Sequence, residues 1–164
     1  MSVLETLRND HQKVLAHLKT VEKFARHIEK SDHLDLGKLN DVIDAILTYF
    51  SGDLQTREIT IFENLEAEGG SEERIQLFLE LQAEHKACHE LVKNISRQIK
   101  SPVNEMELVK TRLVENLWTI IELRRRHIEK VQQRVYPMLE GYVSRPNPRR
   151  TRNLGILQEL VNFN

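Results

Sequence analysis

Residues 4–28, LETLRNDHQKVLAHLKTVEKFARHI, indicate the fold class of this chain. Their apolar residues recur at alternating intervals of three and four, which is the spacing of one face of an amphipathic helix. His11 occupies the single position in this series where an apolar residue is missing. The stretch therefore predicts a long helix that directs one imidazole ring into a protein core.

Three more segments continue the helical pattern. The second runs from about Leu39 to Leu65, and Gly52 inside it is a point that weakens or bends a helix. The third lies between Gly69-Gly70 and Ser101-Pro102, and the fourth runs from about Val103 to Leu139. Short connections between four long helices favour antiparallel neighbours. The sequence thus predicts an all-α, up-down-up-down four-helix bundle.

Five polar side chains occupy apolar positions in these segments: His11, Glu58, His85, His89 and His127. Burying ionisable groups is costly unless they are paired, neutralised or bound to a metal. At about 1.5 Å per residue, all five lie roughly 10–20 Å from the same end of the predicted bundle. Such imidazoles and a carboxylate suit iron, zinc or manganese. The alternative is a group of core histidines whose hydrogen bonds are satisfied within the protein.

The composition limits the classes of function. The 164 residues suit one compact domain, which we expect over residues 1–141, followed by a basic tail over residues 142–164. The chain has 24 basic and 25 acidic residues, and this near-neutral balance argues against a general polyanion binder. The basic tail lacks interleaved aromatic residues and the chain has no recognisable reading helix, so we expect no nucleic-acid binding. It contains no nucleophile–base arrangement and no glycine-rich phosphate loop with the required context. We therefore assign no enzymatic turnover from the sequence.

The tail and the single cysteine indicate the setting of the protein. The tail reads as an extended linker whose arginines suit a protein partner, and residues 154–161 favour a short terminal helix. The lone cysteine, Cys88, cannot form an internal disulfide, which suits a reducing compartment. We expect neither a secretory signal nor a membrane span, and hence a cytoplasmic location.

The sequences around the five polar residues resemble those of hemerythrin-like, HHE-type cation-binding proteins over about residues 1–140. The matching stretches are LRNDH at 7–11, REITIF at 57–62, Glu84-His85 with His89, HIEK at 127–130 and VYP at 135–137. The family fold is a four-helix bundle around a carboxylate-bridged di-iron centre. Its members bind oxygen, nitric oxide or peroxide, so the resemblance implies a small diatomic ligand or oxidant here.

The resemblance also implies ligand roles for the five residues. His85, His89 and His127 would bind one iron, His11 would bind the other, and Glu58 would bridge the two. Iron is therefore the expected metal, as a single ion or an incomplete pair, with zinc or manganese as alternatives.

Two positions depart from the family pattern. Leu54 stands where the family has a histidine, and Gln132 stands where it has an acidic residue. The site thus loses one imidazole and one negative charge, both from around the second ion. Gln132 remains as a weak ligand or an outer hydrogen-bond partner. Asp53 would replace the missing imidazole only if Gly52 lets the helix bulge.

Two functions follow from these observations. The first is a metal-binding protein that binds or senses the diatomic ligand or oxidant. The second is a metal-poor bundle that acts through protein interaction. Among the remaining residues, Arg124, Arg125 and Arg126 are interpreted as a solvated helix face with one long stem packed along apolar neighbours, with an anion or partner site as the alternative. Tyr136 is interpreted as a half-buried packing residue with its hydroxyl at the edge of the core, although it could line the pocket.

Overall fold

The computed structural model describes residues 2–31, 36–50, 53–67, 69–99 and 106–143. These ranges form α1 (Val3–Lys30), α2 (Leu36–Phe50), α3 (Asp53–Ala67), α4 (Glu72–Ile99), α5 (Met106–Lys130), the π-helix η1 (Val131–Val135) and α6 (Tyr136–Val143). They contain no β-strand.

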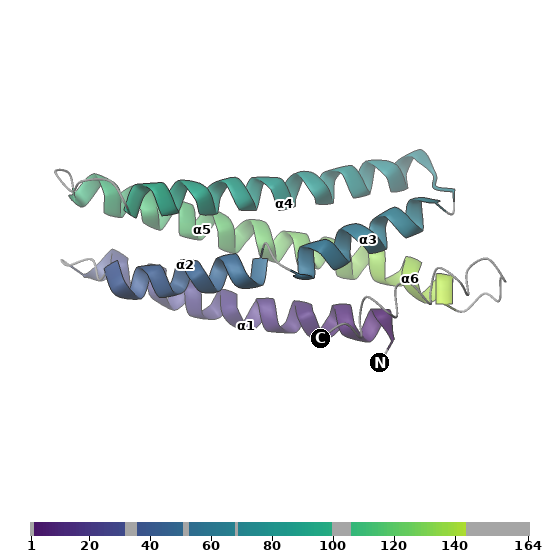
Figure 1. The fold of residues 1–164 in the computed structure, drawn as a ribbon, viewed down its shortest axis with the longest axis horizontal. Helices are drawn as coiled ribbons and strands as arrows, with labels where there is room; N and C mark the ends of the chain where they lie inside the picture. Colours follow the sequence, from purple (N-terminus) through teal and green to yellow (C-terminus); the bar gives the residue numbers. More distant parts are fainter. Residues whose placement is uncertain (1, 32–35, 51–52, 68, 100–105, 144–164) are drawn as a thin grey trace.

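Figure 1 shows the helices as four long rods that run side by side, with successive rods antiparallel. The first rod is α1, the second is α2 with α3, the third is α4, and the fourth is α5 with η1 and α6. The first and third rods each pack on the second and the fourth. The predicted all-α four-helix bundle is confirmed.

A capping box fixes the start of α1 and hence the depth of the residues along it. The Ser2 hydroxyl accepts a hydrogen bond from the Glu5 backbone N–H at 3.2 Å, and the Glu5 carboxylate accepts one from the Ser2 N–H at 2.7 Å. These two bonds satisfy backbone donors that a helix N-terminus leaves unpaired.

The second rod is divided, whereas the sequence pattern predicted one segment over residues 39–65. Helix α2 ends at Phe50 and α3 begins at Asp53, and Gly52, the position expected to weaken or bend the helix, lies outside the described residues. In Figure 1 the axes of α2 and α3 are offset from each other. Helix α3 is the piece that carries Glu58.

A π-helical stretch at residues 131–135 interrupts the fourth rod without breaking it. A π turn adds about one residue to an α-helical turn and rotates everything after it by about 100°. On a regular helix Tyr136 would lie about 180° around the axis from His127, on the opposite face. With the extra residue it lies about 80° away, and Tyr136 is buried.

The apolar positions predicted for α1 form its buried face, except Leu4, which is only partly buried. They are Leu7, Val14, Leu18, Val21, Ala25 and Ile28. Each is at most 3% exposed, and they join residues of the other rods in one continuous core. His11 lies within this series and is also fully buried. The core is therefore apolar along most of its length and polar at the level of His11.

The chain ends of the domain are only partly described. Helix α6 continues to Val143, slightly beyond the predicted boundary at residue 141. The predicted tail, its arginines and the short terminal helix lie outside the described residues, so they stay predictions. Among the described helices, none is both long enough and apolar enough to span a membrane.

Candidate metal centre

Each rod of the bundle brings one ionisable side chain to the same buried layer. His11 comes from α1, Glu58 from α3, His85 from α4 and His127 from α5, and none is more than 2% exposed. The sequence predicted all four, because each replaces an apolar residue on the inner face of its helix. In the structure these four residues meet from four different helices, as the sequence predicted.

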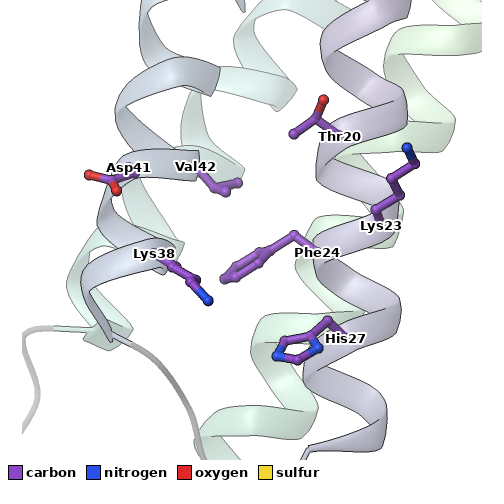
Figure 2. A pocket seen from close by; sticks show the side chains of 7 residues that line it. All are labelled: Thr20, Lys23, Phe24, His27, Lys38, Asp41 and Val42. Atoms are coloured by element: carbon purple, nitrogen blue, oxygen red, sulfur yellow. The ribbon is translucent and has the colours of Figure 1, made fainter.

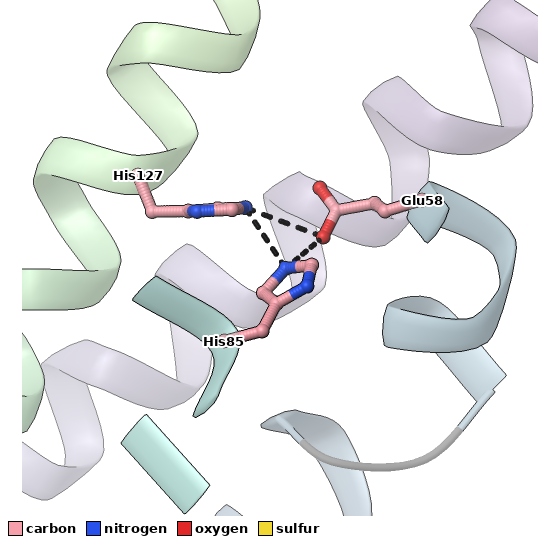
Figure 3. A group of neighbouring side chains, drawn as sticks. All are labelled: Glu58, His85 and His127. Atoms are coloured by element: carbon pink, nitrogen blue, oxygen red, sulfur yellow. Dashed lines mark hydrogen bonds and ion pairs between the residues drawn. The ribbon is translucent and has the colours of Figure 1, made fainter. Parts of the chain in front are cut away.

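Three of them place ligand atoms around one point (Figure 3). His85 Nε2 lies 2.7 Å from Glu58 Oε2 and 3.1 Å from His127 Nε2, and His127 Nε2 lies 3.3 Å from Glu58 Oε2. In a metal site with bonds of about 2.1 Å, neighbouring ligand atoms are roughly 3.0–3.4 Å apart. Two of the three distances fall in this range and the third, 2.7 Å, is shorter, so the three atoms lie close enough together to share one cation.

The pairwise contacts of these three atoms favour a cation over a set of hydrogen bonds. In a hydrogen bond one atom donates and the other accepts. Three atoms in mutual contact cannot all satisfy this rule, since two of them must share the same role. A bound cation removes the conflict, because all three atoms then act as lone-pair donors. Two imidazoles and a carboxylate therefore fit a first-row transition metal.

Glu84 and Lys130 orient His127 from outside the group. His127 Nδ1 donates to Glu84 Oε2 at 2.9 Å, and Lys130 Nζ donates to Glu84 Oε1 at 2.6 Å. This chain directs the Nε2 atom of His127 toward Glu58 and His85. A carboxylate on the far nitrogen is the usual partner of a metal-binding histidine, which it orients and makes more basic.

The electrostatics of the centre place negative charge on Glu58. Burial alone would raise the pKa of Glu58, but contacts with His127, His11 and His85 hold it well below its usual range. Burial lowers the pKa of His85, against the opposing effect of Glu58. Burial also acts to lower the pKa of His127, but Glu58 and Glu84 outweigh it and raise that pKa. Glu58 and His85 thus offer lone pairs at neutral pH.

His11 contacts the other oxygen of Glu58. Its Nε2 lies 2.6 Å from Glu58 Oε1, and its Nδ1 lies 2.6 Å from the hydroxyl of Tyr136. His11 is therefore beside the three-atom group but outside it. His85 Nδ1, by contrast, is buried without a hydrogen-bond partner among the described residues.

The remaining predicted site residues are less closely placed. His89 is half-buried one turn after His85 and is not part of the three-atom group. Gln132 is half-buried in η1. Leu54 is packed in the core at 9% exposure, one turn before Glu58. The side chain of Asp53 lies outside the described residues, so its predicted role stays a prediction.

Sequence reasoning missed three contributors to the centre. The Tyr136 hydroxyl is buried against His11 rather than at the edge of the core, because η1 rotates it inward. Arg124 is 2% exposed, so it is buried more deeply than the one packed stem expected among the three arginines, and its charge acts on His85, Cys88 and His127. Glu84 had one available signal, its position directly before His85.

A surface hollow of about 400 Å³ lies between α1 and α2, away from the centre. Figure 2 shows Phe24 and Val42 facing it, with Lys23, His27 and Lys38 around them. None of its lining residues belongs to the buried layer, and the lining residue of α1 nearest to His11, Thr20, is nine positions, or about 13.5 Å, along the helix from it. The hollow is thus separate from the candidate metal centre.

Comparisons with known proteins identify the domain. The family model of the hemerythrin HHE cation-binding domain matches residues 2–139, nearly the whole described bundle. No curated protein and no solved structure matches the chain.

Proposed function

Because its residues 2–139 match that model, the chain belongs to the hemerythrin HHE cation-binding domain family, and we propose that its centre holds iron and binds a small diatomic ligand or oxidant. Metal binding is the function the family implies. Iron, and oxygen, nitric oxide or peroxide as the ligand, are our proposal.

The observation that carries this proposal is the meeting of Glu58 Oε2, His85 Nε2 and His127 Nε2 in a fully buried layer. Two histidines and one carboxylate are a ligand set of ferrous iron in non-haem proteins, and such a set leaves coordination positions open. Bound ferrous iron would supply the electron that oxygen or nitric oxide accepts on binding.

The residues around the centre favour a small ligand. Leu54 and Ile61 are buried on the same helix as Glu58 and form an apolar wall beside it. An apolar wall excludes water and offers no hydrogen bond to a larger polar ligand. The 2.9 Å hydrogen bond from His127 Nδ1 to Glu84 holds the His127 ring with its Nε2 toward the other ligand atoms. The chain thus supplies a rigid, dry surrounding for a diatomic molecule.

The test is anaerobic loading of the purified protein with ferrous iron, followed by exposure to air or nitric oxide. We expect new charge-transfer absorption bands at stoichiometric iron. His85→Ala should abolish them, whereas the matched control His27→Ala, on the exposed part of α1, should leave them unchanged. His89→Ala reports whether the half-buried histidine adds a ligand. Absence of any spectral change in the wild-type protein would contradict the proposal.

The buried Leu54 favours a second candidate, a bundle that acts by protein interaction without metal. Leucine offers no lone pair and fills its position with core packing at 9% exposure. Melting with and without chelator separates the two functions. A free metal concentration of 100 times the dissociation constant stabilises the native state by about 2.7 kcal/mol. An unchanged melting temperature after metal removal would favour the interaction protein.

A further inference from the structure

Helix α4 carries an apolar patch on the face that points away from the bundle. Ile75 is 38% exposed and Leu79 is 55% exposed, and these two residues lie one turn apart. Leu79 lies about 160° around the helix from the buried Leu77 and Leu81, so it faces outward. In Figure 1 this helix runs along the upper edge of the bundle. The patch is therefore open to a partner.

The pairing of two exposed apolar side chains distinguishes this patch from the rest of the described surface. Among the described residues, one other large apolar side chain is exposed, that of Leu108 near the start of α5, at 43%. Single exposed leucines are common on protein surfaces, whereas adjacent ones can mark the places where proteins associate. Leaving Ile75 and Leu79 in water forgoes the free energy that their burial would release. A partner surface that covered them would recover it.

Two residues of opposite charge lie at equal distances on either side of Leu79. Glu72 is seven residues before Leu79 and Lys86 is seven residues after it, or about 10.5 Å along the helix in each direction. Seven residues make nearly two turns, so each charged residue lies within about 20° of the line of Leu79 along the helix. Glu72 and Lys86 are both exposed, and neither forms an ion pair with another described residue. Both charges are thus available to a partner.

This order of side chains is complementary to itself when a second α4 runs antiparallel to the first. A twofold axis beside Leu79 places Glu72 of each copy opposite Lys86 of the other, and the two Leu79 side chains against each other. Helices that cross at about 20° keep positions seven residues apart in contact. A parallel arrangement would instead bring like charges together. The antiparallel contact covers the apolar patch of both copies and pairs all four charges.

We propose that the outer face of α4 is a dimerisation surface, where two copies of this chain associate through antiparallel α4 helices centred on Leu79. An interface built on one helix of each copy is at the small end of specific interfaces, so the dimer is reversible and depends on protein concentration. The surface is separate from the metal centre, since His85 points inward from the same helix and is 2% exposed. This inference does not depend on the proposed function.

The first experiment measures the mass of the full chain by sedimentation equilibrium over a wide range of protein concentrations. We expect an equilibrium between monomer and dimer. Leu79→Lys should abolish the dimer, because it places two cations together at the axis. Leu108→Lys is the matched control, since it charges the exposed leucine of α5 and should leave the equilibrium unchanged. A wild-type protein that stays monomeric at every concentration would overturn the inference, and so would equal effects of the two variants.

The second experiment tests the antiparallel register by exchanging the two charges. Glu72→Lys alone and Lys86→Glu alone each place like charges opposite each other at two points of the interface. Each single variant should therefore raise the dissociation constant of the dimer roughly 10-fold. The double variant restores both opposite-charge pairs and should return the dissociation constant to the wild-type value. A double variant in which the two losses simply multiply would overturn the proposed pairing.

The third experiment traps the contact covalently. In Leu79→Cys the two new thiols meet at the axis, so mild oxidation should give a disulfide-linked dimer on a non-reducing gel. Leu108→Cys is the control and should remain monomeric under the same conditions. The native Cys88 is 1% exposed, so it does not compete for the oxidant. Equal cross-linking of the two variants would contradict the proposed arrangement.

Discussion

Metal binding should release one proton, and His127 should be its source. In the metal-free protein the pKa of His127 is raised above its ordinary value of 6.5, because Glu58 and Glu84 outweigh the opposing effect of burial. Its Nε2 must give up a proton before it can bind a cation. Burial lowers the pKa of His85, and the surrounding histidines lower that of Glu58. These two ligands therefore bring no proton to release.

The sign and size of the pH dependence follow from this count. At pH values below the pKa of metal-free His127, the binding constant should rise about tenfold per pH unit, or about 1.4 kcal/mol. Above that pKa the slope should vanish, because His127 is already neutral. The rise begins to level off only above pH 6.5, since the pKa is shifted upward.

Calorimetry with cobalt(II) near pH 6, in two buffers of different ionisation enthalpy, measures the released protons directly. Glu84→Gln is an informative variant, because it removes the carboxylate that lies 2.9 Å from His127 Nδ1. It should lower the pKa of His127 and move the levelling-off to lower pH. Heats that do not depend on the buffer would refute the reasoning, and so would the release of two protons.

Three further perturbations have defined outcomes. Ser2→Ala removes the helix cap of α1 and should lower the free energy of unfolding by about 1 kcal/mol in urea titration, with metal stoichiometry unchanged. Phe62→Ala removes a fully buried ring that stacks on Phe78 at 5.1 Å, and should cost about 3–5 kcal/mol in the same titration. Leu54→His adds an imidazole one turn before Glu58 and should tighten cobalt(II) binding in calorimetry; an unchanged affinity would show that the new ring does not reach the ligand atoms.

The bundle and its inward polar residues were predictable because both depend on helical periodicity. His11, Glu58, His85 and His127 interrupt apolar faces, and four interruptions at a similar depth predicted one layer. His89 shares a helix with His85 and also interrupts its apolar face, yet it is only half-buried. Helical periodicity predicts only roughly on which side of its helix a residue lies. The packing of neighbouring helices then decides whether a residue at the edge of the inner face is buried.

The partners of the site were harder to predict. Tyr136 points inward only because of the π turn, which has no recognisable local signature in VQQRV. Arg124 lies in a run of three arginines, and the pattern does not tell which of them faces the core. Gly52 indicated a point of weakness in the second segment, and it lies outside the described residues. Interactions between distant helices, such as that of His127 with Glu84, depend on the assembled fold.

Because of the π turn, the number of residues in the fourth rod matters as much as their identity. Loss of any one residue between positions 131 and 135 would allow an uninterrupted α-helix, which is the easier backbone to form. Everything after it would turn by about 100°, so the phenol would swing toward solvent and the imidazole on α1 would lose its anchor. Substitution of the exposed Gln133 and Arg134 should therefore be tolerated, whereas shortening of the stretch should not be.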